Sequence, residues 1–250
     1  MKVVAVIPSR YKSSRFPGKP LADICGKPMI WWVYNQAKKV QEIDEVYVAT
    51  DDERIYDVCI SENINVVMTS DKCPTHLERI YEFSTKVDAD FYININGDEP
   101  LIESKCIRDL IPSKDIDPNS DYMANGMMIL KDPIDAIDSS KIKVAVDMLG
   151  YCMYMARSPI PFPKGRGDYQ LKKFVGVQCY TKKALEFVNR TKRGFLESIE
   201  DIDEFRFLEN GYKIKMILTE ANTLAVDTPK DLEKVRGIIK AKIDSGEIKI

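Results

Sequence analysis

The chain has 250 residues, of which 44% are hydrophobic and 30% are charged, with a net charge of −2 at pH 7; this predicts an ordinary globular α/β domain. The near-neutral charge argues against general nucleic-acid binding, and six scattered cysteines with a single histidine argue for reduced thiols and against a zinc site. No run approaches eighteen apolar residues and the N-terminal apolar run is too short for a signal peptide, so we expect a cytoplasmic protein with no membrane partner.

The first part of the chain alternates two kinds of segment. Short runs rich in β-branched and aromatic residues predict buried strands at residues 2–8, 45–50, 64–69 and 90–96. The longer segments between them have apolar spacing near 3.6 and predict helices at residues 28–40, 51–62 and 75–87. This alternation predicts right-handed βαβ units and a mostly parallel sheet covered by helices on both faces.

The rhythm changes after about residue 115. Strand-like runs follow at residues 119–130, 141–157 and 172–181, with a hairpin predicted at Asp-Met-Leu-Gly-Tyr (residues 147–151). Prolines at 159, 161 and 163 argue against regular structure there. Residues 193–211 predict one helix ending at Gly211, residues 212–219 a strand, and residues 228–245 a last helix with Thr228 as its N-cap and Pro229 at its first position. We therefore expect one sheet with an inserted β-rich arm.

The segment after the first strand, VIPSRYKSSRFPGKPL, is unusually rich in cations. Arg10, Lys12, Arg15 and Lys19 fall within ten residues, at the end of the sheet where open α/β proteins bind ligands. Several arginine and lysine heads can share the charge of a polyphosphate. G-x-G-x-x-G is absent, and proline follows Lys19 where a P-loop has Ser or Thr. The alternative is that these cations are solvated surface charges, which is most plausible for Lys12.

Two aspartates at predicted strand ends are candidate ligands for Mg²⁺. Asp98 follows Gly97 at the end of one strand, and Asp227 lies between a strand and the last helix. Magnesium is commonly held by a few carboxylates and by the phosphate oxygens of its substrate. The alternative for Asp227 is a structural role at the start of the helix, where a carboxylate stabilises free N–H groups.

Six blocks, in order, carry a resemblance to a known family: IPSRYKSSRFPGKPL, GKPMI, VATDDERI, NGDEPLI, ARSPIPF and VDTPKDLEKVR. The chain resembles the 3-deoxy-manno-octulosonate (Kdo) cytidylyltransferases, or CMP-Kdo synthetases, over essentially its whole length. The resemblance implies a Rossmann-like nucleotidyltransferase fold of the nucleotide-diphospho-sugar transferase type, with a mostly parallel mixed sheet and an inserted β-rich dimerisation arm. It also implies a Mg²⁺-dependent homodimer that joins CTP to an acidic sugar, releases pyrophosphate and serves cell-surface polysaccharide synthesis.

The resemblance divides the single domain of residues 1–250 into a nucleotide-binding part (about 1–115), an acceptor and dimerisation part (about 116–210) and a return to the sheet (211–250). It assigns catalysis to Lys19, Arg10 and Asp98, nucleotide binding to these three with Ser14 and Arg15, and metal binding to Asp98 and Asp227. Transfer of this kind needs positioning and charge neutralisation more than a catalytic histidine.

The acceptor end departs from the family pattern. The family's G-T-E-R is His76-Leu77-Glu78-Arg79 here, its H-x-G-I-Y-G-Y-R is FVGVQCYT (residues 174–181), and its L-E-Q-L-R is Ile202-Asp203-Glu204-Phe205-Arg206. The resemblance places acceptor binding at Arg79, Arg157, Tyr180, Asp203 and Glu204. Where the family has a Glu-Gln pair, this chain has Asp203-Glu204, so a carboxylate replaces a neutral amide. This change suggests an acceptor with an added cationic group, such as an amino-substituted ulosonic acid. The alternative is that these acidic side chains lie on a helix surface and touch no ligand. His76 is interpreted as a loop residue at the rim of the pocket.

Other functions remain open from the sequence. One is a cytidylyltransferase for a different acid, such as a sialic-type acid or a phosphonate. Another is a glycosyltransferase of related fold, but Asp51-Asp52 lacks the spacing of a D-x-D metal motif. A third is a nucleotide-binding subunit that has lost its acceptor site, against which the cation-rich loop and both aspartates argue.

Overall fold

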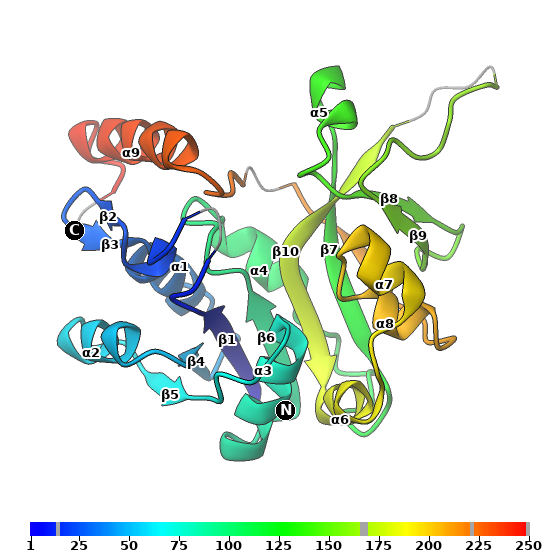
Figure 1. Cartoon of the computed structure of the whole chain (residues 1–250), viewed down its shortest axis with the longest axis horizontal. Coiled ribbons are helices and arrows are strands. Elements are labelled where there is room, and N and C mark those ends of the chain that lie inside the picture. Colours follow the sequence, from blue (N-terminus) through cyan, green and yellow to red (C-terminus); the bar gives the residue numbers. More distant parts are fainter. Residues whose placement is uncertain (14–15, 166–169, 221–222, 249–250) are drawn as a thin grey trace.

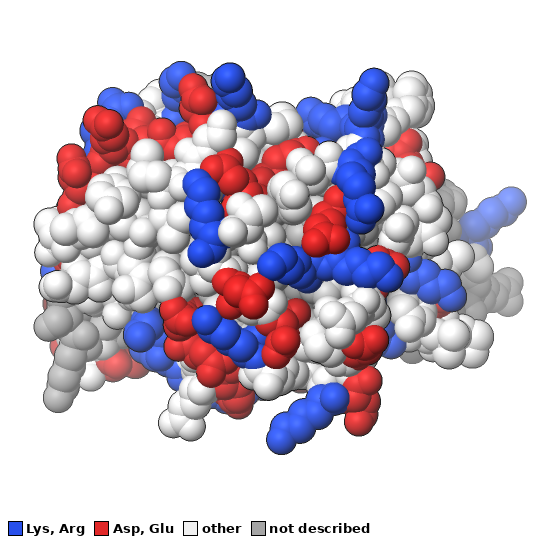
Figure 2. All heavy atoms as spheres, turned by 90° about the horizontal axis from the view of Figure 1, so that it is seen from below, with Lys and Arg blue, Asp and Glu red and all other residues white. Residues whose placement is uncertain are grey.

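The computed structural model describes residues 1–13, 16–165, 170–220 and 223–248 (Figure 1). The proposed nucleotide ligands Ser14 and Arg15 lie outside the described residues. Basic and acidic side chains are intermixed on the face shown in Figure 2. None of the described helices has the length and apolar character needed to cross a bilayer.

Within the described residues, nine strands form one mixed sheet, and a small hairpin of β2 and β3 lies apart from it. The strands are β1 (Val3–Ser9), β2 (Asp23–Ile24), β3 (Lys27–Pro28), β4 (Glu45–Thr50), β5 (Val66–Met68), β6 (Phe91–Ile95), β7 (Met123–Ile129), β8 (Lys143–Val146), β9 (Cys152–Ala156), β10 (Lys172–Thr181) and β11 (Lys215–Leu218). The main path runs β11-β7-β10-β6-β1-β4-β5, and β8 joins β10 and carries β9.

The sheet is parallel except around β10 and the arm, which confirms the predicted architecture. Strands β6, β1, β4 and β5 are parallel neighbours, and β11 is parallel to β7. Strand β10 is antiparallel to both β6 and β7. Strand β6 is buried along its whole length, which explains why its sequence is apolar on both faces apart from Asn94, since a strand covered on both faces has no solvent-exposed side.

The helices cover both faces of the sheet. They are α1 (Met29–Lys38), α2 (Glu53–Ser61), α3 (His76–Lys86), α4 (Ser104–Asp109), α5 (Pro133–Ile137), α6 (Lys182–Arg190), α7 (Phe195–Glu200), α8 (Phe205–Leu208) and α9 (Pro229–Asp244), with a 3-10 turn η1 (Lys19–Leu21). One core cluster packs α1, α2 and α4 on one face, and a second packs α3, α6 and α8 on the other. A third joins α9 to α1 and β2.

The last helix begins as its sequence predicts. Thr228 is the N-cap of α9, Pro229 is its first residue, and the side chains of Thr228 and Asp231 form a capping box. Asp231 therefore fills the structural role that was the alternative for Asp227. Thr75 and Glu78 cap α3 in the same way, which fixes where that helix starts at the edge of the site.

The arm contains the predicted hairpin. Strands β8 and β9 are antiparallel, and the turn between them is closed by hydrogen bonds from the Asp147 N–H to the Tyr151 carbonyl and from the Tyr151 N–H to the Asp147 carboxylate. In Figure 1 this hairpin projects from the end of the sheet that carries β7 and β10.

The single helix predicted for residues 193–211 is wrong. The structure has two short helices, α7 and α8, separated at Asp201, whose φ of 50° is left-handed. The guanidinium of Arg157 donates to the carbonyls of Glu200 and Asp201, at 2.6 and 2.9 Å, and so satisfies the end of α7 from a distant segment. Gly211, with φ of 81°, lies three residues beyond α8. Helices α4, α5 and α6 were not predicted.

Candidate active site

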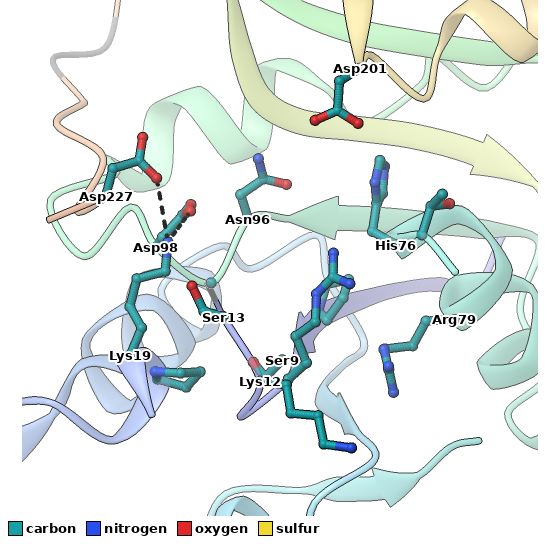
Figure 3. A pocket seen from close by; sticks show the side chains of 15 residues that line it. Ser9, Lys12, Ser13, Lys19, His76, Arg79, Asn96, Asp98, Asp201 and Asp227 are labelled. Carbon is teal, nitrogen blue, oxygen red and sulfur yellow. Dashed lines mark hydrogen bonds and ion pairs between the residues drawn. The ribbon is translucent and has the colours of Figure 1, made fainter. Parts of the chain in front are cut away.

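A cavity of about 490 Å³ lies at the carboxyl ends of the adjacent parallel strands β1 and β6 (Figure 3). This is where the sequence placed the ligand site, because loops of a parallel sheet converge beyond its strand ends. Its walls come from the loop after β1, the loop after β6, the start of α3, and two residues from the distal part of the chain, Asp201 and Asp227.

The loop after β1 is held in a fixed shape by Gly18 and Tyr11. The Gly18 N–H donates to the Tyr11 carbonyl at 2.9 Å, and Gly18 has φ of 72°. A Cβ at Gly18 would lie 3.0 Å from the Tyr11 ring, so glycine is needed both for the backbone conformation and for this close approach. The guanidinium of Arg54, from α2, stacks on the same ring at 3.3 Å. The turn that follows carries Lys19 to the cavity.

Lys19 brings the two predicted metal ligands together. Its Nζ lies 2.7 Å from Oδ2 of Asp98 and 3.7 Å from Oδ1 of Asp227, and all three side chains are partly buried (Figure 3). The Val226 N–H donates to the Asp98 carbonyl at 2.8 Å, which ties the segment before α9 to the loop after β6. The two carboxylates, which the sequence could not show to be neighbours, thus face one ammonium group.

The carboxylates suit a magnesium ion bound with a nucleotide. In the part of the chain that the structure describes, no group of three or more His, Cys, Asp or Glu side chains could enclose a metal. Asp98 and Asp227 instead form a pair of carboxylates. Mg²⁺ typically binds one or two carboxylates and completes its coordination shell with phosphate oxygens and water. The position that both carboxylates face already holds a cation, the Lys19 ammonium, which shows that a positive charge is accommodated there.

Glu99 is a buried acid beneath this site that the sequence did not single out. Its carboxylate accepts a hydrogen bond from the Gly176 N–H at 3.2 Å, and the Asn96 N–H donates to the Gly176 carbonyl at 2.8 Å. Burial, together with the charge of Asp98, raises the pKa of Glu99 to about 7. These contacts fasten the loop that carries Asp98 to β10. The signal was present in the motif Gly-Asp-Glu-Pro, where Glu99 follows the metal candidate directly.

A second cavity, of about 240 Å³, adjoins the first and shares Arg10, Thr75, His76, Asn96 and Asp201 with it. The shared lining makes the two cavities one continuous site. The outer part of the second cavity is lined by Arg193 and by the segment that joins α7 to α8.

His76 lies between two carboxylates in this second cavity. It is the first residue of α3 rather than a loop residue, and its Nδ1 lies 2.7 Å from Oδ2 of Asp203 while its Nε2 lies 3.6 Å from Oε1 of Glu204. Burial disfavours the charged ring, but the two neighbouring carboxylates outweigh it and raise the pKa of His76 to about 10. Burial raises and the hydrogen bond from His76 lowers the pKa of Asp203, and the net shift is downward.

A buried ion network supports the same wall. The guanidinium of Arg206, which is 1% exposed, donates to Glu197 at 2.9 Å through Nε and also binds Glu78. Arg193 contacts Glu197 at 3.1 Å and Asp203 at 3.9 Å. Arg206 therefore joins α8 to α3, and this join places Glu204 beside His76.

The residues predicted for acceptor binding separate into two sets. Asp203 and Glu204 line the second cavity, and Arg79 lines the first. The Arg79 guanidinium also donates a hydrogen bond to the Asp51 carboxylate at 3.0 Å. Tyr180 is fully buried with its ring stacked on Phe207, and Arg157 is occupied with backbone carbonyls at the end of α7; neither lines these two cavities. The exposed Arg10 lines both cavities, and Lys12 lines the first.

Comparison with known proteins gives the family. A sequence model described as cytidylyltransferase matches residues 4–215. The chain belongs to the cytidylyltransferase family. This membership makes it a nucleotidyltransferase and confirms the resemblance inferred from the six motif blocks.

Individual relatives of this cytidylyltransferase cover nearly all of it. It is 37% identical over 246 residues to a mitochondrial 3-deoxy-manno-octulosonate cytidylyltransferase of Arabidopsis thaliana, covering 96% of this chain and 84% of the relative. It is 39% identical over 237 residues to an 8-amino-3,8-dideoxy-manno-octulosonate cytidylyltransferase of Shewanella sp. (strain W3-18-1), covering 94% and 97% of the two chains.

Solved structures support the same conclusion. A CMP:2-keto-3-deoxy-manno-octonic acid synthetase complexed with CTP is 36% identical and matches with a TM-score of 0.90, covering 97% of this chain and all of that one. The inositol-1-phosphate CTP transferase of T. maritima matches with a TM-score of 0.65 at 14% identity over 96% of each chain, which shows a shared fold alone.

Proposed function

We propose that this cytidylyltransferase transfers CMP from CTP to an acidic 3-deoxy-ulosonic sugar, Kdo or its 8-amino analogue, with release of pyrophosphate, for cell-surface polysaccharide synthesis. The names of the relatives at 37% and 39% identity support this acceptor class, and the CTP complex of the structural relative supports the nucleotide. The two adjoining cavities support a site for two substrates. The first contains the predicted nucleotide and metal residues Arg10, Lys19, Asp98 and Asp227, and the second contains the predicted acceptor residues Asp203 and Glu204.

In this reaction a hydroxyl oxygen of the sugar attacks the α-phosphorus of CTP. The new bond joins that oxygen to phosphorus, the bond from the α-phosphorus to the α–β bridging oxygen breaks, pyrophosphate leaves with the electron pair, and the hydroxyl proton passes to solvent. Negative charge grows on the transferring group and on the departing pyrophosphate, so the enzyme must supply fixed positive charge there.

The chain's own cations are placed for this task. Lys19 is held between Asp98 and Asp227 at the base of the first cavity, and Arg10 and Lys12 project from the same loop. A bound triphosphate would give the three cations a partner with the opposite charge. Removal of a preorganised, partly buried cation such as Lys19 typically lowers the rate about 100- to 1000-fold, whereas loss of an exposed cation such as Lys12 costs less.

The carboxylates of Asp98 and Asp227 fit a magnesium ion as the cofactor. Asp98 and Asp227 would hold it, and when bound it supplies additional positive charge for the phosphate oxygens. Glu99 and Gly176 serve this set indirectly by fixing the loop that carries Asp98.

A homodimer formed through the arm is part of the proposal. Large apolar side chains are exposed on the β8–β9 hairpin at Met148, Leu149 and Met153, and on α7 at Phe195 and Ile199. Three of these side chains lie on one hairpin, and large apolar side chains exposed close together often mark protein–protein contacts, so this arm is suited to burial against another copy of the chain.

The observation that carries the function is the convergence of Asp98 and Asp227 on Lys19 at the strand ends. The test is a pyrophosphate-release assay with CTP and Mg²⁺ against Kdo, 8-amino-Kdo, a sialic-type acid and a phosphonate. We expect release with one or both octulosonates. Release only with the sialic-type acid or the phosphonate would replace the acceptor, and release with none would contradict the transferase proposal.

Asp98→Asn tests the metal assignment. It keeps the size of the side chain but removes the charge, so we expect loss of turnover and weaker Mn²⁺ binding, measured by electron paramagnetic resonance with CTP present, while the circular dichroism spectrum stays unchanged. An Asp98→Asn protein with full turnover would remove Asp98 from the metal site.

A further inference from the structure

Buried polar atoms without partners gather at the floor of the second cavity. Among the described residues, seven buried side-chain nitrogen and oxygen atoms lack a hydrogen-bond partner, and three of them, His76 Nε2, Gln178 Nε2 and Glu204 Oε1, belong to residues that line this cavity. Buried polar groups are nearly always satisfied in folded proteins, because an unmade hydrogen bond costs free energy. A cluster of such atoms at the wall of a cavity therefore points to a ligand.

Gln178, Glu204 and His76 line the second cavity together and form its polar floor. Two further unpartnered atoms lie next to this floor. Asn94 is paired with Gln178 across β6 and β10 and joined to it by a hydrogen bond, and Tyr180 lies two residues beyond Gln178 on β10.

The chemistry of the floor favours the hydroxyl or amino groups of the sugar's tail. Amide and imidazole donors occur there beside a carboxylate acceptor, a mixture that hydroxyl or amino groups can satisfy. Asp203 and Glu204 face His76, so this part of the cavity offers carboxylate acceptors rather than free positive charge. Arg10 belongs to the wall that the two cavities share. Its positive charge is available there to the acid group of the sugar and to the triphosphate.

Of the groups at the floor, Glu204 is the one that most specifically requires a charged hydrogen-bond donor. Its residue is 2% exposed, its Oε1 accepts no hydrogen bond, and the nearby His76 Nε2 is 3.6 Å away, beyond hydrogen-bond reach. A charged acceptor gains more from an ammonium donor than from a neutral hydroxyl, since both partners then carry charge.

We propose that Glu204 and His76 together determine which acceptor tail the enzyme prefers: Glu204 receives a primary ammonium group in preference to a hydroxyl, and the positive charge of His76 limits that preference. The inference rests on the proposed function and deepens it, because the reacting hydroxyl lies in the first cavity and the remainder of the sugar extends into the second.

The test compares kcat/KM for 8-amino-Kdo and for Kdo at saturating CTP, by pyrophosphate release. Glu204→Gln keeps the shape and removes the charge, so the ratio of amino to hydroxy acceptor should fall about tenfold. His76→Gln removes the opposing cation, so the ratio should rise. Glu186→Gln, the same chemical change on the exposed surface of α6, should leave it unchanged.

Each outcome decides between explanations. An unchanged ratio in Glu204→Gln, or a shift of both variants in the same direction, would overturn the inference. CTP affinity measured calorimetrically without acceptor should stay within twofold in every variant, which separates a change of preference from misfolding. If the wild-type protein binds CTP but releases pyrophosphate with neither acid, the proposed function itself fails.

Discussion

The Lys19 ammonium lies 2.7 Å from a carboxylate oxygen of Asp98, and this contact joins the cation-rich loop after β1 to the acidic loop after β6. Asp227 approaches the same ammonium from the segment before α9. One lysine thus forms ion pairs with both of the acids that the sequence assigned to a metal. Lys19 must therefore serve two sets of partners, the carboxylates in the free protein and the phosphates in the complex.

Replacement of Lys19 by alanine tests this double role. Lys19→Ala removes a positive charge from the site of phosphoryl transfer, so kcat/KM for CTP should fall about 100- to 1000-fold. Without the lysine, the two carboxylates also lose their counter-charge, and Mn²⁺ should bind more tightly to the protein in the absence of CTP, as measured by electron paramagnetic resonance.

Lys12→Ala is the comparison for this variant, because Lys12 is an exposed cation on the same loop. Its loss should lower kcat/KM less than tenfold and leave Mn²⁺ binding unchanged. Equal effects of the two variants would show that the loop contributes only a general electrostatic field.

The elevated pKa of His76 predicts a pH-dependent contribution to stability. Its folded pKa of about 10 lies above the ordinary value of 6.5, so the stabilisation is fully present below pH 6.5 and is lost as the pH rises through 10. The difference in unfolding free energy between wild type and His76→Gln should therefore shrink from pH 6 to pH 10, measured by urea denaturation. A difference that is constant over this range would contradict a charged His76 in the folded protein.

Gly176 predicts a steric effect on the active-site loop. A Cβ at Gly176 would collide with the Glu99 carboxylate and the Asn96 amide, both part of the loop that carries Asp98. Gly176→Ala should destabilise the fold by about 1–3 kcal/mol and lower kcat, because the loop must move. Thermal unfolding and steady-state kinetics measure the two effects.

Gly237, in the middle of α9, provides the opposite control. Apart from the helix's own nearby backbone, no atom lies within 4 Å of a Cβ built there, so Gly237→Ala should stabilise the protein by about 0.5–1 kcal/mol through better helix propensity. A neutral Gly176→Ala would show that Glu99 can reorient at little cost.

The exposed hairpin predicts the oligomeric state. If Met148 and Met153 are buried between two copies, Met148→Glu with Met153→Glu should convert a dimer into a monomer in size-exclusion chromatography with light scattering. The matched change Ile60→Glu, at an exposed apolar residue of α2, should leave the mass unchanged. A wild-type protein that is monomeric at all concentrations would contradict the proposed interface.

Local signals explain what the sequence predicted well. The strands of the first half are continuous apolar runs, and the start of α9 is marked by Thr228 and Pro229, whose preference for these positions depends only on neighbouring backbone. The sequence could place Lys19 and Asp98 at the same edge of the sheet because both lie in loops that follow parallel strands, and the structure brings the two side chains into contact.

Long-range contacts explain what it missed. The break between α7 and α8 depends on Arg157, which caps the end of α7 from another part of the chain, and no local pattern marks it. The same break turns Asp203 toward His76, so the ring is a partly buried cation that lines both cavities. The sequence assigned Tyr180 to the acceptor, but α8 covers this tyrosine, whose ring stacks on Phe207, so it lines neither cavity.

The hydrogen bond from the Val226 N–H to the Asp98 carbonyl has a consequence for biosynthesis. Asp227 reaches the site only through this late segment, whereas Lys19 and Asp98 are translated early. A nascent chain can therefore fold its first strands on the ribosome but cannot hold both carboxylates in place until β11 and α9 have emerged. Catalytic competence should therefore appear only after this segment has docked on the loop that carries Asp98.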